Sequence, residues 1–333
     1  MQSQTKEPAI APQPTHVYPG SWIFNRRTLG WLSEASLRRQ LPLLYRLFGL
    51  YSHLYFANTD QTHLKGGRAL FLAIAQGYRR WVQLGSATRP FLTVQLPQYT
   101  IVLNPLDPRF LQVVHELRDE QSDTRILSHL LSAGDTFIDL GANHGSFAVV
   151  ASQLVGAAGY VVAVEPQPWL AQAVELSLRA NALCRFEVYQ TALGNTTGNI
   201  ELLIPKDTSG SAGQYAAHSG THDYETVTVP IQPLDTLVDG STFPGQVVLK
   251  LDVEGSEYAV LVGAKQMIMA RKPTLILEVH PGTLKASETL GEDLKSLLQD
   301  LGYQTYADLY NICDKLPVDD LEMTQQRNIV LSQ

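Results

Sequence analysis

The chain has 333 residues, of which 44% are hydrophobic and 17% charged, a globular composition long enough for one large domain or two small ones. Its formal net charge of −7 at pH 7 argues against a nucleic-acid-binding surface, which would be basic, so no nucleic-acid partner is predicted. The two cysteines, Cys184 and Cys313, form no metal-binding or redox spacing, which favours buried thiols in a cytoplasmic protein.

The N-terminal third differs in pattern from the rest of the chain. Residues 1–20 are polar and proline-rich, without the regions of a signal peptide, and are predicted to be a disordered tail. Residues 21–115 are predicted to be mostly helical, with a hairpin over 91–103 that turns near Pro97. The apolar stretch in this region is shorter than the roughly 20 residues of a membrane span, so no transmembrane segment is predicted. We expect this region to wall an acceptor pocket or to form a homodimer interface.

From residue 116 onward, short apolar runs alternate with amphipathic segments. This alternation predicts an α/β fold in which a mostly parallel sheet is covered by helices on both faces. Ligands of such sheets bind beyond the carboxyl ends of the strands. Strands are expected at 136–140, 160–164, 186–191, 247–252 and 274–279, and helices at 145–155, 168–181, 257–269 and 284–301.

A glycine turn follows the first of these strands. Gly141 and Gly145 close the turn, but Asn143 and Ser146 occupy the second and third glycine positions of the dinucleotide loop G-x-G-x-x-G. Asp139, at the strand end, would repel a pyrophosphate but can pair with the ammonium of a cationic ligand. S-adenosylmethionine is such a ligand, since it carries an amino acid end and a sulfonium and no phosphate.

The next strand ends in Glu165, which is followed by Pro166. A carboxylate at this point can accept hydrogen bonds from both hydroxyls of a ribose, as it does in nicotinamide sites. The two turns together favour S-adenosylmethionine; the alternative is an ordinary fold element whose acids cap helices. The predicted cofactor site comprises Asp139, Gly141, Asn143, His144, Gly145, Ser146, Glu165, Pro166, Ala192 and Asp252.

The segments IDLGANHG, VVAVEP and KLDVEGSE occur in this order along the chain. With them the sequence resembles the FkbM family of S-adenosylmethionine-dependent methyltransferases over about residues 95–333, and KLDVEGSE is the most specific segment. The resemblance implies a class I methyltransferase, Rossmann-like fold over 116–333, with a seven-stranded, mostly parallel sheet and a helical N-terminal extension. Strands near 303–307 and 328–331 would complete that sheet. It also implies a small-molecule, polyketide or sugar acceptor, free or carrier-bound, as in natural product biosynthesis.

The third motif supplies the candidate catalytic residues. Lys250, Asp252 and Glu254 alternate along the strand end, so they are expected to share one face. One of the acids can bind or deprotonate an acceptor hydroxyl, and Lys250 can lower the pKa of a neighbouring group. His280 is a further candidate base, because the ordinary pKa of histidine is near neutral. The alternative for Lys250 and Glu254 is an internal ion pair with a helix cap.

The predicted function is O-methylation of a hydroxyl; N-methylation, a non-catalytic docking module and a nicotinamide-dependent oxidoreductase are the alternatives. A divalent metal is not demanded by any ligand spacing, although Asp252, Glu254, Glu278 and His280 can converge. A pair of strands is expected at 200–204 and 226–231. The long loop between them, 206–225, is predicted to be a lid over the acceptor, or else a surface loop without a role.

Overall fold

The structure is a computed structural model that describes residues 22–25, 30–32, 91–96, 98–103, 113, 116, 117, 123–205, 212–215 and 224–333. The expected tail, the helices predicted between residues 33 and 90, and most of the predicted lid lie outside the described residues. Among the described residues, no helix has the length and apolar character that crossing a bilayer requires.

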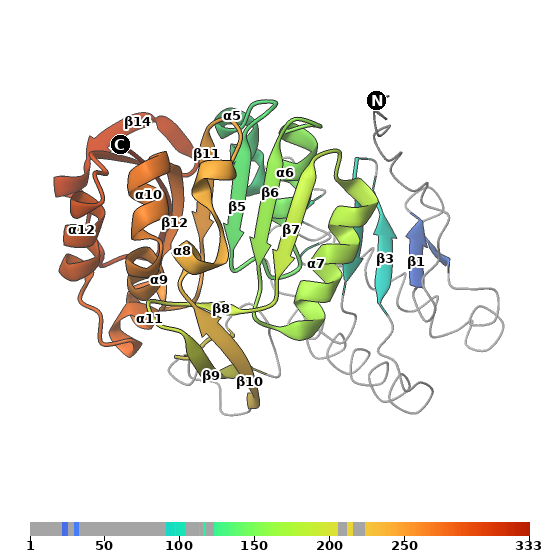
Figure 1. Ribbon diagram of the computed structural model, residues 1–333, viewed down its shortest axis with the longest axis horizontal. Helices are drawn as coiled ribbons and strands as arrows, with labels where there is room; N and C mark the ends of the chain where they lie inside the picture. Colours follow the sequence, from blue (N-terminus) through green and yellow to red (C-terminus); the bar gives the residue numbers. More distant parts are fainter. Residues whose placement is uncertain are drawn as a thin grey trace, which may run out of the picture.

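The described core is a sheet in the order β14-β13-β15-β12-β11-β5-β6-β7 (Figure 1). Strands β7 to β12 in that order run parallel, whereas β15, β13 and β14 are each antiparallel to their neighbours. The seven predicted strands are present, and β14 is an eighth that the sequence did not predict. The strands are β5 (Thr136–Leu140), β6 (Tyr160–Val164), β7 (Arg185–Tyr189), β11 (Val247–Leu251), β12 (Thr274–Val279), β13 (Thr305–Asp308), β14 (Asn311–Pro317) and β15 (Arg327–Ser332).

Helices cover the sheet on both faces, so every residue of β5, β6 and β11 is buried. Alternate residues of β5 belong to different hydrophobic clusters: Phe137 packs with α6 and α7, and Ile138 packs with α8, α9, α10 and α12. The helices are α5 (Leu127–Leu130), α6 (Ser146–Leu154), α7 (Pro168–Asn181), α8 (Leu234–Leu237), α9 (Glu257–Gly263), α10 (Lys265–Arg271), α11 (Pro281–Ala286) and α12 (Gly291–Asp300). A 3₁₀ turn, Asp123–Ile126, precedes α5.

Two of the predicted helices are each divided in two. The helix expected at 257–269 is interrupted at Ala264, where α9 ends and α10 begins. Asp235 causes this break, because its carboxylate accepts the backbone N–H groups of Gln266 at 2.8 Å and Met267 at 2.9 Å and so caps a new helix. The helix expected at 284–301 is likewise divided into α11 and α12.

Two smaller sheets flank the core (Figure 1). The predicted hairpin is confirmed as β3 (Leu92–Gln95) and β4 (Thr100–Leu103), which form a sheet with β1 (Trp22–Asn25) and β2 (Gly30–Leu32). β1 and β2 are strands where helical periodicity was expected, which corrects the prediction at those residues. The other sheet has the order β8-β10-β9, with β8 (Ala192–Leu193), β9 (Gly198–Pro205) and β10 (Tyr224–Gln232), and it confirms the second predicted strand pair.

Candidate functional site

A cavity lies beyond the carboxyl ends of β5, β6 and β11, with β8 and β9 on its other side. The empty space within it is about 680 Å³, which includes open solvent at its mouth. Six predicted cofactor residues line it: Gly141, Asn143, Glu165, Pro166, Ala192 and Asp252. Residues that the sequence did not single out complete the lining, among them Val164, Gln167, Thr191, Leu193, Gln214, Val253 and Ser256.

The turn after β5 is compact because three of its residues adopt left-handed backbone conformations: Gly141 (φ 80°), Asn143 (φ 51°) and Gly145 (φ 80°). A Cβ atom on Gly141 would lie 1.8 Å from the backbone oxygen of Asp252. Only glycine therefore allows the β5 turn to approach the end of β11 this closely. Asparagine tolerates the left-handed region better than most residues, which suits Asn143 to its position.

Glu165 holds this turn from the neighbouring strand. Its Oε2 accepts the backbone N–H of Asn143 at 2.8 Å, and its Oε1 accepts that of Gln167 at 2.9 Å. Burial raises the pKa of Glu165 to about 7, although the two backbone N–H groups oppose the shift. Each carboxylate oxygen offers two acceptor positions, so each retains one for a ligand in the cavity. This arrangement fits a pair of ribose hydroxyls.

Lys250 joins the β5 turn to the end of β11. Its Nζ lies 3.4 Å from Asp139 Oδ1 and 3.2 Å from Asp252 Oδ2, and it donates to the backbone oxygen of Gly141 at 3.3 Å. Burial acts to lower the pKa of Lys250, but the two carboxylates outweigh it and raise the pKa above its ordinary value. The two carboxylates therefore favour the protonated form of Lys250, and the predicted internal ion pair is present.

Asp139 is fully buried and is not among the described residues that line the cavity. Burial raises the pKa of Asp139, and Lys250 opposes that rise. The two residues face each other because the parallel register of β5 and β11 pairs Asp139 with Lys250. The ammonium that Asp139 pairs with in this structure is that of Lys250, and the pair supports the loop rather than contacting the cavity.

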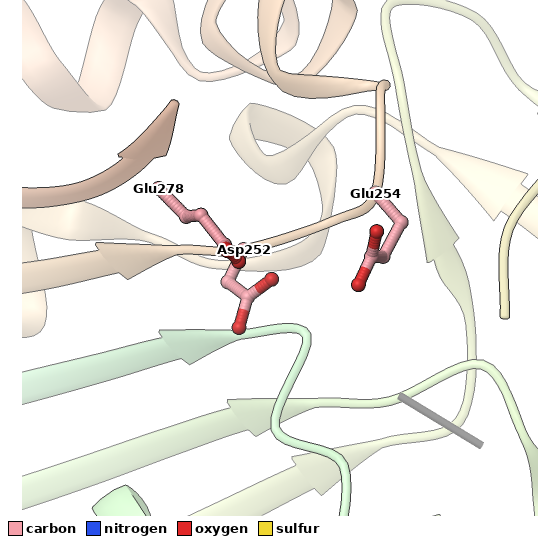
Figure 2. Close-up of side chains that lie close together, drawn as sticks. All are labelled: Asp252, Glu254 and Glu278. Carbon is pink, nitrogen blue, oxygen red and sulfur yellow. The ribbon is translucent and has the colours of Figure 1, made fainter. Parts of the chain in front are cut away.

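Three carboxylates lie close together beyond β11 and near the end of β12, as Figure 2 shows. One oxygen each of Asp252, Glu254 and Glu278 lies within 4.8 Å of the others. Burial, and next the negative charge of Asp252, raise the pKa of Glu278 to about 8. Three carboxylate oxygens at this separation can hold a divalent cation, or can hold a proton between them and accept one from a hydroxyl. Asp252 and Glu254 lie close together, but not on one face of an extended strand as expected, because β11 ends at Leu251 and Glu254 lies in the following turn with a φ of 53°.

His280 has a different place from the three acids. It caps α11: its Nδ1 accepts the backbone N–H of Thr283 at 3.2 Å, and Pro281 occupies the first turn of the helix. His280 is neither in the carboxylate group nor among the described residues that line the cavity. The structure therefore does not bring this predicted base to the other candidate residues.

Three further predicted cofactor residues lie behind the cavity lining. Ser146 donates its hydroxyl to Glu116 Oε2 at 3.1 Å, and Gly145 packs against Val174, which a Cβ would approach to 3.1 Å. His144 is buried, with its Nδ1 at 2.8 Å from Asn143 Oδ1. These residues shape the turn and its contact with the rest of the domain.

Glu257 is a buried site residue that sequence reasoning missed. It is 4% exposed, and its Oε1 accepts the backbone N–H groups of Gly255 at 3.0 Å and Val253 at 3.4 Å. Burial raises its pKa to about 7. The only signal in the sequence is its place as the last letter of KLDVEGSE, where an acid is usual at the start of a helix.

Comparison with known proteins gives a consistent result. Residues 139–305 match the family described as Methyltransferase FkbM domain. The hexuronic acid methyltransferase AglP of Haloferax volcanii is 28% identical over 209 residues, which is 61% of this chain and 81% of that protein.

Two solved structures show weaker similarity. Methyltransferase FkbM from Methylobacillus flagellatus superposes with a TM-score of 0.39 at 16% identity, over 68% of this chain and 52% of its own length. This chain thus spans about half of that protein. A SAM-dependent O-methyltransferase from Thermotoga maritima superposes with a TM-score of 0.33 at 13% identity, over 70% and 73% of the two chains.

Proposed function

We propose that this chain, which belongs to the FkbM methyltransferase family, transfers a methyl group from S-adenosylmethionine to a hydroxyl oxygen of a sugar or another small-molecule acceptor. Family membership follows from the match over residues 139–305, half of the chain, and makes the protein a methyltransferase. The donor, the accepting atom and the acceptor class are the proposed part.

The cavity supports the choice of donor. Glu165 would hold the ribose with its two remaining acceptor positions, and Asn143 lies beside it on the β5 turn. Val164 and Leu193 add apolar surface to the lining. When bound, S-adenosylmethionine supplies the activated methyl group and the sulfonium leaving group. The protein then has to bind the two substrates in line and to remove a proton.

The observation that carries O-methylation is the position of Asp252. It lines the cavity and also belongs to the carboxylate group with Glu254 and Glu278. A hydroxyl loses its proton as it is methylated, and a carboxylate beside it can orient the hydroxyl and accept that proton. The ammonium of Lys250, 3.2 Å away, favours the ionised form of Asp252 that this role requires. The sugar acceptor is proposed from the name of the Haloferax relative.

The test uses the purified protein, trideuteromethyl S-adenosylmethionine and the methyl glycosides of glucuronic acid, glucose and glucosamine. We expect a trideuteromethyl group on an oxygen of at least one glycoside, located by mass spectrometry and NMR. Asp252→Asn should lower kcat by about 100-fold or more, in the range of a lost general base, whereas the exposed Asp300→Asn should leave it unchanged. Methylation only at the amino group of glucosamine would overturn the hydroxyl assignment.

The same assay separates a metal-free site from a metal site. No ligand spacing in the sequence demands a cation, so we expect activity to survive EDTA. Loss of activity with EDTA and its recovery with Mg²⁺ would instead assign Asp252, Glu254 and Glu278 to a divalent cation.

A further inference from the structure

We propose that Glu257 is a positioning residue for the acceptor side of the site: its carboxylate fixes the turn, residues 252–256, that carries Asp252 and Glu254. The inference rests on the proposed role of these two acids toward the acceptor. It concerns a residue outside the cavity lining, which acts through the backbone of the residues that do line it.

The contacts of Glu257 run backward along the chain. Glu257 is the first residue of α9, yet its side chain folds over the preceding turn, and one oxygen, Oε1, accepts the N–H groups of both Val253 and Gly255. These amides follow the end of β11, where the sheet no longer supplies acceptors. Buried backbone N–H groups require partners, and Glu257 provides one for two of them.

The residue between these two amides is Glu254. Its φ of 53° lies in the left-handed region, which a residue with a Cβ adopts only at a cost, and Gly255 follows at φ 101°. Hydrogen bonds to the residues on both sides of Glu254 restrict the dihedral angles that it can adopt. The direction of the Glu254 carboxylate toward Asp252, visible in Figure 2, depends on that backbone conformation.

The other side of the turn is confined by packing. A Cβ on Gly255 would lie 3.0 Å from the backbone oxygen of Thr283 and 3.1 Å from the ring of Tyr215. A Cβ on Gly213 would lie 3.3 Å from the Cβ of Glu254. The turn is thus enclosed by residues 212–215, by the start of α11 and by Glu257, whose side chain accepts hydrogen bonds from two of its backbone amides.

A general stabilising effect on α9 explains these contacts less well. An acid at a helix start interacts favourably with the helix dipole when it is exposed, as Glu292 is in the first turn of α12. Burying a carboxylate costs free energy unless hydrogen bonds compensate it. Among the described residues Glu257 Oε2 has no hydrogen-bond partner, so the buried charge is offset by backbone N–H groups: those of the two turn amides at Oε1 and that of Glu257 itself.

The first experiment measures hydrogen exchange at the amides of Val253 and Gly255 in the full chain. Glu257→Ala should speed exchange at both by about tenfold, the effect of losing one hydrogen bond. Glu257→Gln should exchange like the wild type, because its amide oxygen can accept the same two N–H groups. Glu292→Ala is the matched control for a helix-start acid and should leave both amides unchanged. Unaltered exchange in Glu257→Ala would overturn the proposal.

The second experiment measures methyl transfer to the glycosides and the affinity for S-adenosylhomocysteine. Glu257→Ala should lower kcat by about 100-fold, as small displacements of reacting groups do, and change the affinity by less than about threefold. Glu257→Gln should recover most of the rate. A Gln variant as slow as the Ala variant would mean that charge, not hydrogen bonding, is required, and would overturn the proposal. If Glu257→Ala does not fold, Glu257→Asp replaces it, since the shorter side chain cannot reach both amides.

The two experiments also separate this inference from the proposed function. If the wild-type protein methylates none of the glycosides, the proposed acceptor is wrong, and the exchange measurement still decides whether Glu257 fixes the turn. If the wild-type protein is active and Glu257→Ala keeps its full rate, the proposed function stands and the positioning role is wrong.

Discussion

Two turns at the carboxyl ends of the neighbouring strands β5 and β11 are each held by a buried glutamate, but the two glutamates differ in whether they line the cavity. In each, a buried glutamate accepts backbone N–H groups: Glu165 accepts that of Asn143 in the β5 turn, besides that of Gln167 after β6, and Glu257 accepts two in the β11 turn. Glu165 uses one oxygen for each N–H and lines the cavity, whereas Glu257 uses one oxygen for both and does not line it. Glu165 therefore keeps acceptor positions for a ligand, whereas Glu257 accepts hydrogen bonds from the backbone alone.

The two turns are also joined to each other. The Lys250 ammonium contacts Asp139 before one turn and Asp252 at the start of the other, and Gly141 allows the two backbones to touch. Variants that remove the contacts between the two turns should reduce stability more than variants that alter a single turn.

The largest effect is expected from Lys250→Met. Removing one partner of a buried ion pair should destabilise the fold by about 3–5 kcal/mol, because Asp139 is left buried without its cation. Without Lys250 the folded-state pKa of Asp139 rises further above its unfolded value, so the loss should grow as pH increases from 5 to 8. Urea unfolding across this range measures it. In the double variant with Asp139→Leu most of the stability should return. If it does not, the unpaired Asp139 carboxylate is not the cause of the loss in stability.

The next largest effect is expected from Gly141→Ala. The new Cβ would meet the backbone oxygen of Asp252 at 1.8 Å, which should cost roughly 2–4 kcal/mol of stability and weaken cofactor binding. The matched control is Gly134→Ala, at φ 92° with no described atom within 4 Å of its Cβ, which should cost only about 1 kcal/mol. Equal losses in urea unfolding would mean that backbone conformation, not the contact between the turns, makes Gly141 necessary.

Glu165 tests the cofactor side alone. Glu165→Gln should weaken binding of S-adenosylhomocysteine by roughly 1.5–3 kcal/mol, the range for hydrogen bonds to a charged group. With a pKa of about 7, Glu165 becomes ionised as pH rises from 6 to 8, and ionisation frees an acceptor position for the ribose. Affinity should therefore rise about tenfold over this interval. Calorimetry on the wild type and on Glu165→Gln over this pH range separates the titration of Glu165 from that of the ligand. If the affinity of both proteins changes equally with pH, Glu165 is not the titrating group.

The smallest effect is expected from Ser146→Ala. Ser146 donates to Glu116 and lies behind the cavity lining, so the variant should lose about 1 kcal/mol of stability or less. Its affinity for S-adenosylhomocysteine should stay within about twofold of the wild type. A tenfold loss of affinity would return Ser146 to the cofactor site, where the sequence pattern places it.

The sequence predicted an element well where the residues of that element determine it, and poorly where residues distant in the chain do. The bounds of β5 and β6 were predicted to the residue, because each is a short apolar run between turn residues. β14 was missed because six of its seven residues are exposed and carry no alternating pattern; pairing with β13 makes it a strand. The break between α9 and α10 was missed because Asp235, about thirty residues earlier in the chain, caps the second helix.

The candidate site divides in the same way. Gly141, Glu165 and Asp252 were identified because turn spacing and position at a strand end are readable from neighbouring residues. His280 could not be separated from the acids by sequence, because its capping bond to Thr283 depends on where α11 begins. The role of Glu257 depends on the backbone conformation of the preceding turn, which the sequence motif does not specify.

The position of β15 sets the order in which this sheet can form. β15 is the last described strand along the chain, yet it lies inside the sheet, between β12 and β13. During synthesis the edge of β12 therefore stays open, and the β13–β14 pair has no place in the sheet until residues 327–332 emerge. Open strand edges are templates for aggregation. The edge of β12 that carries Glu278 is thus covered only by the last described strand, through the pairing of Glu278 with Asn328.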